Sequence, residues 1–198
     1  MLLKLEISHN IEETMIKVYR LKVDVNKYQY FLPEQEEYEA KLWMDCISKA
    51  DNWLPPPVFV YKPFHKKGDF YSFNSSALIT SPKATQVLYP FLEVAGELLP
   101  LPYQGELFTL LNVTECIDCL HQQKTEWMQS KDTGDNLWIK KYVFHTNRFS
   151  ESDIFKIPET CKSEILIVEG LKDPKDEFRY AVESAGLQGI VFEEIWKE

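Results

Sequence analysis

The sequence predicts an α+β fold, a mixed, mainly antiparallel twisted sheet with about three helices packed on it. Two observations support this class. Short apolar runs bounded by Gly, Pro, Asn and Asp recur along most of the chain, which is typical of strands joined by hairpins and meanders. A strand, helix, strand order that suggests a parallel crossover is found only near the C-terminus, between residues 164 and 196.

In the first part of the chain, an approximately alternating run predicts a strand over 15–25, and a turn at 24–27 leads to a second strand over 27–33. The two strands together suggest a hairpin. Residues 34–50 have an acidic start and a mixed pattern, and we interpret them as a loop with one helix at most. The three prolines before 58–61 favour an extended entry into an edge or terminal strand.

The central part opens with the clearest helix signal, a serine N-cap followed by Pro82 at the first helical position. An apolar stripe continues from there to a stop at Gly96, and Pro90 on the opposite face predicts a kink or a break into two pieces. Two strands are expected next, over 97–103 and 106–113. Prolines in the first of them suit an edge strand.

The last third is expected to contain strands over 137–144, 164–169 and 189–196, with a helix over 173–186 before the last strand. The polar residues 130–135 are typical of a turn or loop. No internal repeat or low-complexity segment is visible.

Length and composition favour a single domain over residues 15–198. With 44% apolar side chains, the chain can bury a core without disulfides or a structural metal. Residues 1–14 do not match the strand pattern that begins at Met15, and we expect an N-terminal extension there. Its apolar run is interrupted by Lys4, so it does not resemble a secretory signal, and no run approaches the roughly 18 apolar residues of a membrane span. We therefore expect a cytoplasmic protein with reduced cysteines.

The charge balance is acidic, because 31 Asp and Glu against 22 Lys and Arg give a formal net charge of -9. Nucleic-acid affinity is carried by Lys and Arg, so this balance argues against a phosphate-binding surface. An acidic body suits a basic protein partner, but it also serves solubility alone.

The most chemical-looking stretch is TECIDCLH, residues 114–121. Asn112 as the N-cap and Glu115 as the returning arm of a capping box predict a helix here. The expected buried stripe of that helix is Val113, Cys116, Ile117 and Leu120. Cys119 would lie roughly 60° from Cys116 around the helix, and His121 roughly 160° from Cys119. Three ligands placed in this way cannot converge on one metal ion.

Two interpretations of the Cys116 and Cys119 pair remain. A thiol-redox or zinc protein is the alternative, but Cys46 and Cys161 have no second Cys or His at ligand spacing, and acidic neighbours disfavour a thiolate. The favoured interpretation is a pair of small buried side chains. The four histidines are scattered and belong to no motif with a nucleophile and an acid. We therefore assign no catalytic residue, cofactor or metal ligand.

Seven phrases, in order from about residue 15 to the C-terminus, carry a family resemblance. They are KVYRLKVDVNKYQYFLPE, NWLPPPVFVY, KGDFYSF, SPKATQVLYPFLEVAGELLPL, LFTLLNVTECIDCL, IKKYVFHTNRFSESDIFKIPE and AVESAGLQGIVFEEIW. Together they resemble an immunity family of bacterial polymorphic toxin systems, the one numbered eleven and formerly a domain of unknown function. The resemblance implies a small cytoplasmic protein that binds and neutralises a cognate toxin, usually encoded beside it, without catalysis. It also implies a familiar cysteine at Cys119 and a local substitution at Cys116.

The leading hypothesis is therefore a non-catalytic immunity protein whose partner is a toxin or effector with a basic surface. The residues chosen for part of that surface are Glu34, Glu36, Glu37, Tyr38 and Glu39. A solvated face is the plain alternative for this run. A generic protein-interaction module is a further possibility, and the sequence leaves open whether the protein forms a homo-oligomer. Neither a nucleic acid nor a membrane is expected as a partner.

Overall fold

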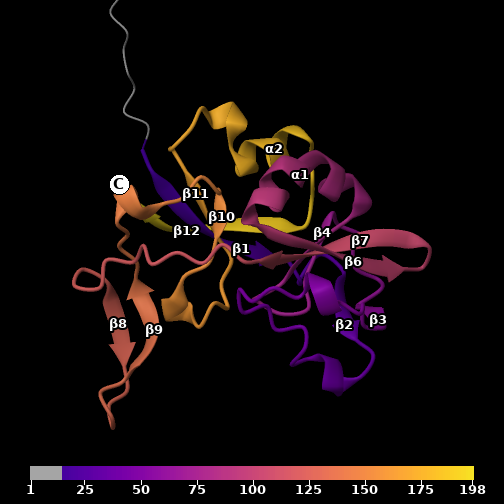
Figure 1. Ribbon diagram of the computed structural model, residues 1–198, viewed down its shortest axis with the longest axis horizontal. Coiled ribbons are helices and arrows are strands. Elements are labelled where there is room, and N and C mark those ends of the chain that lie inside the picture. Colours follow the sequence, from indigo (N-terminus) through magenta and orange to yellow (C-terminus); the bar gives the residue numbers. More distant parts are fainter. Residues whose placement is uncertain (1–14) are drawn as a thin grey trace, which may run out of the picture.

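A computed structural model describes residues 15–198, and the extension expected at 1–14 lies outside the described residues. The α+β class is confirmed, with several antiparallel sheets and two α-helices among the described residues (Figure 1). The helices are α1 (Pro82–Ala95) and α2 (Phe178–Ser184). The prediction of about three helices was slightly too high.

The strands are short and distributed along the whole described chain. They are β1 (Lys17–Val23), β2 (Tyr30–Pro33), β3 (Val58–Tyr61), β4 (Phe70–Tyr71), β5 (Leu78–Thr80), β6 (Gly96–Tyr103), β7 (Glu106–Val113), β8 (Glu126–Gln129), β9 (Asn136–Lys141), β10 (Ile154–Phe155), β11 (Leu166–Glu169) and β12 (Ile190–Lys197). They form two four-stranded sheets, ordered β10-β11-β1-β12 and β4-β5-β7-β6, and two two-stranded antiparallel sheets, β2-β3 and β8-β9.

The strand, helix, strand unit expected near the C-terminus is present, but its two strands, β11 and β12, do not pair with each other. Strands β11 and β12 each pair antiparallel with β1, one on either side of it. They therefore run in the same direction, joined through α2, with β1 between them. Because both edges of β1 are occupied, β2 cannot pair with it.

The predicted hairpin over 15–33 is wrong for this reason. The turn itself exists, since the amides of Lys27 and Tyr28 both donate to the carbonyl of Asp24, at 3.1 and 2.9 Å. The chain then leaves the sheet, and β2 pairs with β3 instead. The expected strand at 58–61 is confirmed as the partner in that pair.

The predictions for α1 and the following hairpin are confirmed. The Ser81 hydroxyl accepts a hydrogen bond from the amide of Ala84 at 3.1 Å, as expected of an N-cap. The helix runs unbroken through Pro90, which is exposed, so the alternative of a break into two pieces is wrong. Strands β6 and β7 pair along their full lengths, and β6 is an edge strand that tolerates Pro100 and Pro102.

The predicted helix around TECIDCLH is wrong. Asn112 and Val113 are the last residues of β7 and pair with β6, so the chain is still extended where the helix was expected to begin. Beyond β7, isolated bridges join Cys116 to Lys156 and Leu120 to Phe144. These long-range contacts hold residues 114–121 as an irregular segment, although the spacing of the apolar residues in this segment also suits a helix.

Three apolar clusters make up the core. The largest lies between the two four-stranded sheets and the helices, which pack together on one side of the molecule (Figure 1). There the rings of Phe91 and Phe178 meet edge to face, with centroids 5.8 Å apart. The other clusters lie beneath β2-β3 and beside β8-β9, so each smaller pair of strands has apolar support. Within residues 15–198, no helix is both long and apolar enough to cross a bilayer.

Candidate functional site

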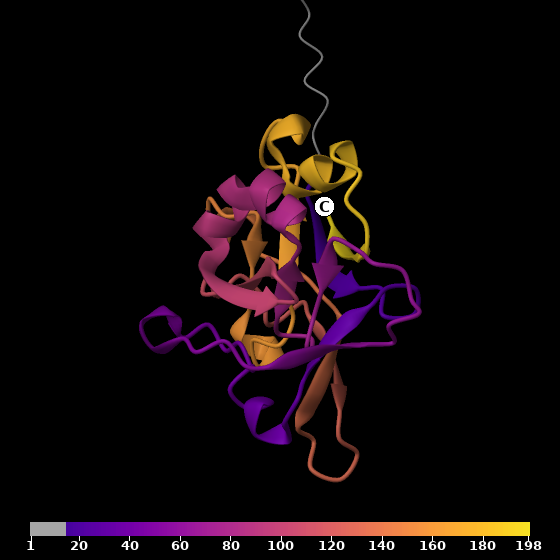
Figure 2. The same ribbon diagram turned by 90° about the vertical axis from the view of Figure 1, so that its right-hand side faces the viewer.

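The acidic segment, residues 34–39, directly follows β2. It contains the five residues that the sequence suggested for a partner surface, and all of them lie within one short turn of chain (Figure 2 shows this indigo part of the molecule in side view). Its four glutamates are exposed, and its tyrosine is half-buried. The structure therefore brings the predicted side chains together on the surface.

Hydrogen bonds on both sides fix the backbone of the acidic segment. Glu36–Tyr38 form a 3₁₀ turn, and the amide of Glu34 donates to the carbonyl of Pro57 at 3.0 Å. On the other side, the amide of Leu42 donates to the carbonyl of Tyr38 at 3.0 Å, and the Leu42 side chain is buried in the cluster beneath β2-β3. The glutamates are thus presented from an ordered turn.

The negative charge of this segment is not neutralised within the described part of the chain. Among the ion pairs of residues 15–198, none involves the glutamates at 34, 36, 37 or 39. The ammonium of Lys41 lies 5.2 Å from the centre of the Tyr38 ring, a contact with the tyrosine and not with a carboxylate. The field of four carboxylates therefore extends into solvent, where it can attract a basic surface.

A groove of about 440 Å³ adjoins the acidic segment. Its lining residues are Tyr38, Lys41, Ser48, Lys49, Asn52, Trp53, Leu54 and Pro55. Trp53 is fixed by a hydrogen bond from its indole nitrogen to the carbonyl of Pro100, at 2.8 Å. The Leu54 side chain is 84% exposed, and Ile47 and Trp43 nearby in the chain are 59% and 39% exposed. Exposed apolar side chains next to unpaired charges are typical of a protein-binding surface.

The carboxylate of Glu97, on β6, organises one wall of this groove. It accepts hydrogen bonds from the Ser48 hydroxyl at 2.5 Å, the Lys49 amide at 2.8 Å and the Asn112 side-chain amide at 2.8 Å. Burial opposes ionisation, but these donors outweigh it and hold the pKa of Glu97 below its usual value. Asn112, predicted as a helix cap, is instead a buried donor that ties the groove to the sheet.

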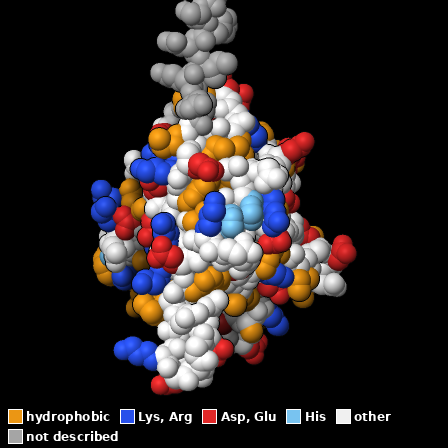
Figure 3. Space-filling view, turned by 90° about the vertical axis from the view of Figure 1, so that its left-hand side faces the viewer, with side chains coloured by type: hydrophobic (Ala, Val, Ile, Leu, Met, Phe, Trp, Pro, Cys, Tyr) orange, Lys and Arg blue, Asp and Glu red, His pale blue; other side chains and the backbone are white. Residues whose placement is uncertain are grey.

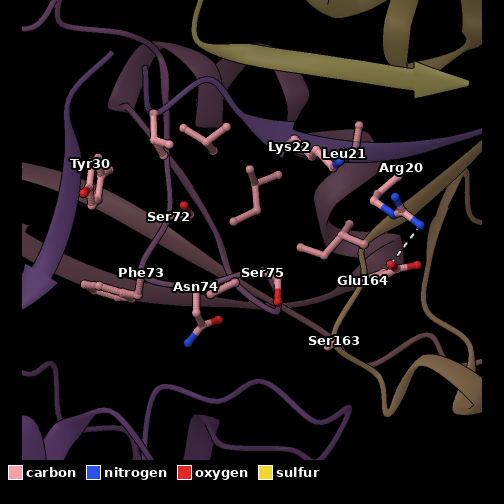
Figure 4. Close-up of a pocket in the computed structure, with 15 residues that line it drawn as sticks. Arg20, Leu21, Lys22, Tyr30, Ser72, Phe73, Asn74, Ser75, Ser163 and Glu164 are labelled. Carbon is pink, nitrogen blue, oxygen red and sulfur yellow. Dashed lines mark ion pairs between the residues drawn. The ribbon is translucent and has the colours of Figure 1, made fainter. Parts of the chain in front are cut away.

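A larger hollow, of about 550 Å³, lies elsewhere, between β1 and the loop that precedes β5 (Figure 4). At one end, the Arg20 guanidinium pairs with the carboxylates of Glu164 and Glu193, each at 2.9 Å. The Tyr142 hydroxyl donates to Glu164 at 2.6 Å and accepts from Arg20 at 2.8 Å. Burial, followed by Glu164, raises the pKa of this tyrosine. These groups compensate one another, which is the behaviour of a structural network.

The Cys116 and Cys119 side chains occupy different environments. Cys119 is completely buried in the cluster beside β8-β9, and burial together with Glu159 raises the pKa of its thiol to about 12. Cys116 is only partly buried. Across residues 15–198, no group of three or more Cys, His, Asp or Glu side chains is placed to hold a metal ion.

Two histidines that are distant in sequence meet on the surface. The rings of His121 and His145 stack with centroids 4.3 Å apart, and Figure 3 shows histidine side chains (pale blue) between basic groups on one face of the molecule. Partial desolvation, followed by Arg148 and then His121, lowers the pKa of His145. No local sequence pattern indicates this pair, because the contact is created by the bridge between Leu120 and Phe144.

Comparison with known proteins adds no assignment. A scan against protein-family models finds no matching family, and a search of curated proteins finds no relative.

The sequence did not indicate the groove or the role of Glu97, since their residues come from two separate parts of the chain. The function must therefore be argued from the surface itself.

Proposed function

We propose that this protein is a non-catalytic immunity protein that binds and neutralises a cognate toxin or effector with a basic surface. The observation that carries the proposal is the ordered acidic segment beside a groove whose lining includes the exposed side chain of Leu54. The resemblance of the seven sequence phrases to an immunity family supports the same class of partner.

The two parts of the surface would contribute differently to binding. The glutamates of the acidic segment lie at the rim, so they should mainly accelerate association and make it depend on salt. Leu54 and Trp43 are large apolar groups that lose solvent contact when a partner covers them, so they should carry more of the affinity. Because the groove wall is fixed by Glu97, little ordering is required on binding.

The partner is best sought as the product of a neighbouring gene that encodes a toxin-like protein. Co-expression should relieve the growth defect that the toxin causes, and the two proteins should co-purify. Replacing Glu36 and Glu37 by Gln should slow association by about 10-fold at low salt and much less at high salt. Leu54→Ala should instead accelerate dissociation, with a loss of about 1 kcal/mol or more.

Glu151→Gln is the matched control. Glu151 is an exposed glutamate that precedes β10, in a different sheet from the groove. We expect this variant to bind as the wild type does. Equal losses in the control and in the Glu36 and Glu37 variants would show that net charge, not this surface, drives association. A toxin that stays fully active in the presence of excess protein would refute the proposed function.

A further inference from the structure

The stacked rings of His121 and His145 lie where two separate segments of the chain pair with each other. The amide of His121 donates to the carbonyl of Val143 at 2.7 Å, and the amide of His145 donates to the carbonyl of Cys119 at 2.8 Å. These two bonds lie on either side of an isolated antiparallel bridge. In such pairing the two histidines are diagonal neighbours on one face, which brings their ring centroids to 4.3 Å.

The two segments continue in the same way beyond the histidines. The amide of Lys124 donates to the carbonyl of His121 at 3.1 Å, and the amide of Arg148 donates to the carbonyl of His145 at 3.0 Å. Each histidine is therefore followed by a tight turn that ends in a basic residue. This repeated pattern gives each ring its own cationic neighbour, and Figure 3 shows pale-blue histidine side chains with basic groups on either side of them.

The cationic side chains of this cluster are accessible and little compensated. Both Lys124 and Arg148 are exposed, and the two imidazoles are half-buried. Among the ion pairs of residues 15–198, none involves Lys124. The Nη1 atom of Arg148 donates to Asp118, at 3.0 Å to the carbonyl and 3.3 Å to the carboxylate. A second acidic group, Glu159, accepts a hydrogen bond from the side-chain amide of Gln122.

Positive charge is thus concentrated around the two rings, and this opposes protonation of His145. Partial desolvation, and then Arg148 and His121, lower the pKa of His145, and Lys124 acts in the same direction. Only Asp118 acts against them among these neighbours. A bound anion would reverse the balance, because it would stabilise the protonated ring and the flanking cations together.

We propose that the two stacked histidines, together with Lys124 and Arg148, bind a tetrahedral oxyanion such as a phosphate or sulfate group. The imidazole N–H groups donate from the centre of the site, and the ammonium and guanidinium groups donate from its two sides. His145 takes up a proton as the anion binds, so affinity increases as the pH falls through the range in which imidazoles titrate. The site shares no residue with the acidic segment or the groove, so its test is independent of the proposed function.

An NMR titration with sulfate tests the site, because the charge of sulfate does not change over the pH range used. The imidazole signals should show a higher pKa of His145 in sulfate than in chloride at the same ionic strength. The signals of His65, in the loop between β3 and β4, should not distinguish the two salts. Sulfate should bind about 5-fold more tightly, or better, near pH 5.5 than near pH 7.5. An equal pKa of His145 in the two salts would overturn the proposal.

Three variants separate this site from a general attraction of anions. Lys124→Gln should weaken sulfate binding by roughly 3-fold to 5-fold at both pH values, because one accessible cation is lost. Lys131→Gln removes the same charge from the turn between β8 and β9 and is the matched control, which should bind as the wild type does. Equal weakening by both variants would show that net charge alone attracts the anion. His145→Gln should abolish the dependence of affinity on pH, and an affinity that still rises at low pH would contradict the mechanism.

The same signals distinguish the two sources of such an oxyanion. Inorganic phosphate and N-acetylphosphoserine amide would be compared near pH 5.5. Tighter binding of the phosphoserine compound would assign the site to a phosphate monoester, and tighter binding of inorganic phosphate would assign it to the free ion. Binding of neither compound, together with no effect of sulfate, would show that the cluster is not an anion site.

Discussion

Replacing Lys156 by Met should change stability in a way that depends strongly on pH. Burial lowers the pKa of this lysine from its usual 10.5 to about 8. Folding therefore disfavours the protonated form, by about 3 kcal/mol when the shift is converted at 1.36 kcal/mol per unit. This cost is complete below about pH 8 and disappears as the pH rises toward about 10.5, so the contribution of Lys156 to stability increases over that window.

The Met variant removes the cost of the buried charge at every pH. It also leaves the carbonyls of Met44 and Ser76 without their donor, at roughly 1–3 kcal/mol each. Near pH 7 the two effects largely offset each other. Near pH 9.5 the cost of the buried charge in the wild type is about 2 kcal/mol smaller than near pH 7. The free energy of unfolding of the variant, relative to wild type, should therefore be about 2 kcal/mol lower at pH 9.5 than at pH 7.

Urea unfolding at both pH values measures this difference directly. Both proteins should carry Cys46→Ala and Cys116→Ala, so that thiol titration does not contribute. Lys131→Met, at an exposed lysine in the turn between β8 and β9, is the control and should show no pH-dependent difference. If the stability difference for Lys156→Met is the same at the two pH values, then the folded protein does not disfavour the ammonium, and the reasoning fails.

Three further predictions concern the core and the groove. Leu88→Ala, in the fully buried stripe of α1, should lower the free energy of unfolding by about 2–5 kcal/mol, whereas Val87→Ala on the exposed side should cost far less, as urea titration would show. Tyr142→Phe should cost about 1–3 kcal/mol because the half-buried carboxylate of Glu164 and guanidinium of Arg20 each lose one hydrogen-bond partner, and an unchanged urea midpoint would contradict the network. Glu97→Ala should lower the free energy of unfolding by about 1–3 kcal/mol, because buried Asn112 and the amide of Lys49 lose their acceptor, and it should increase amide exchange in the chain that lines the groove; unchanged exchange would refute its role as an anchor.

Local signals were sufficient where local chemistry determines the structure. The serine and proline that begin α1 predict its start because the N-cap bond and the fixed proline φ act within one turn. The hairpin of β6 and β7 was equally predictable, since Gln104 and Gly105 both adopt positive φ in its tight turn. In each case the determining contacts join residues that are close in sequence.

The predictions that were wrong concern residues whose determining contacts are distant in sequence. The apolar spacing over 113–120 fits a helix, but pairing of β7 with β6 and the bridge from Cys116 to Lys156 determine the outcome. Lys156 itself could not be recognised as a buried group, because the carbonyls of Met44 and Ser76 that accept its hydrogen bonds are far away in the sequence. Such residues become visible only when the fold has brought their partners together.

The chain between β2 and β3 illustrates how these long-range anchors would assist the proposed binding of a partner. It has little regular structure, so a free loop of this length would lose considerable entropy on binding a partner. Two contacts from the body of the protein remove much of that freedom beforehand. Glu97 holds the backbone at Lys49, and Lys156 holds it at Met44, while the acidic segment and Leu54 remain accessible. An irregular segment fixed in this way can present charged and apolar groups with little further ordering, which is the property that a tight and specific binding surface requires.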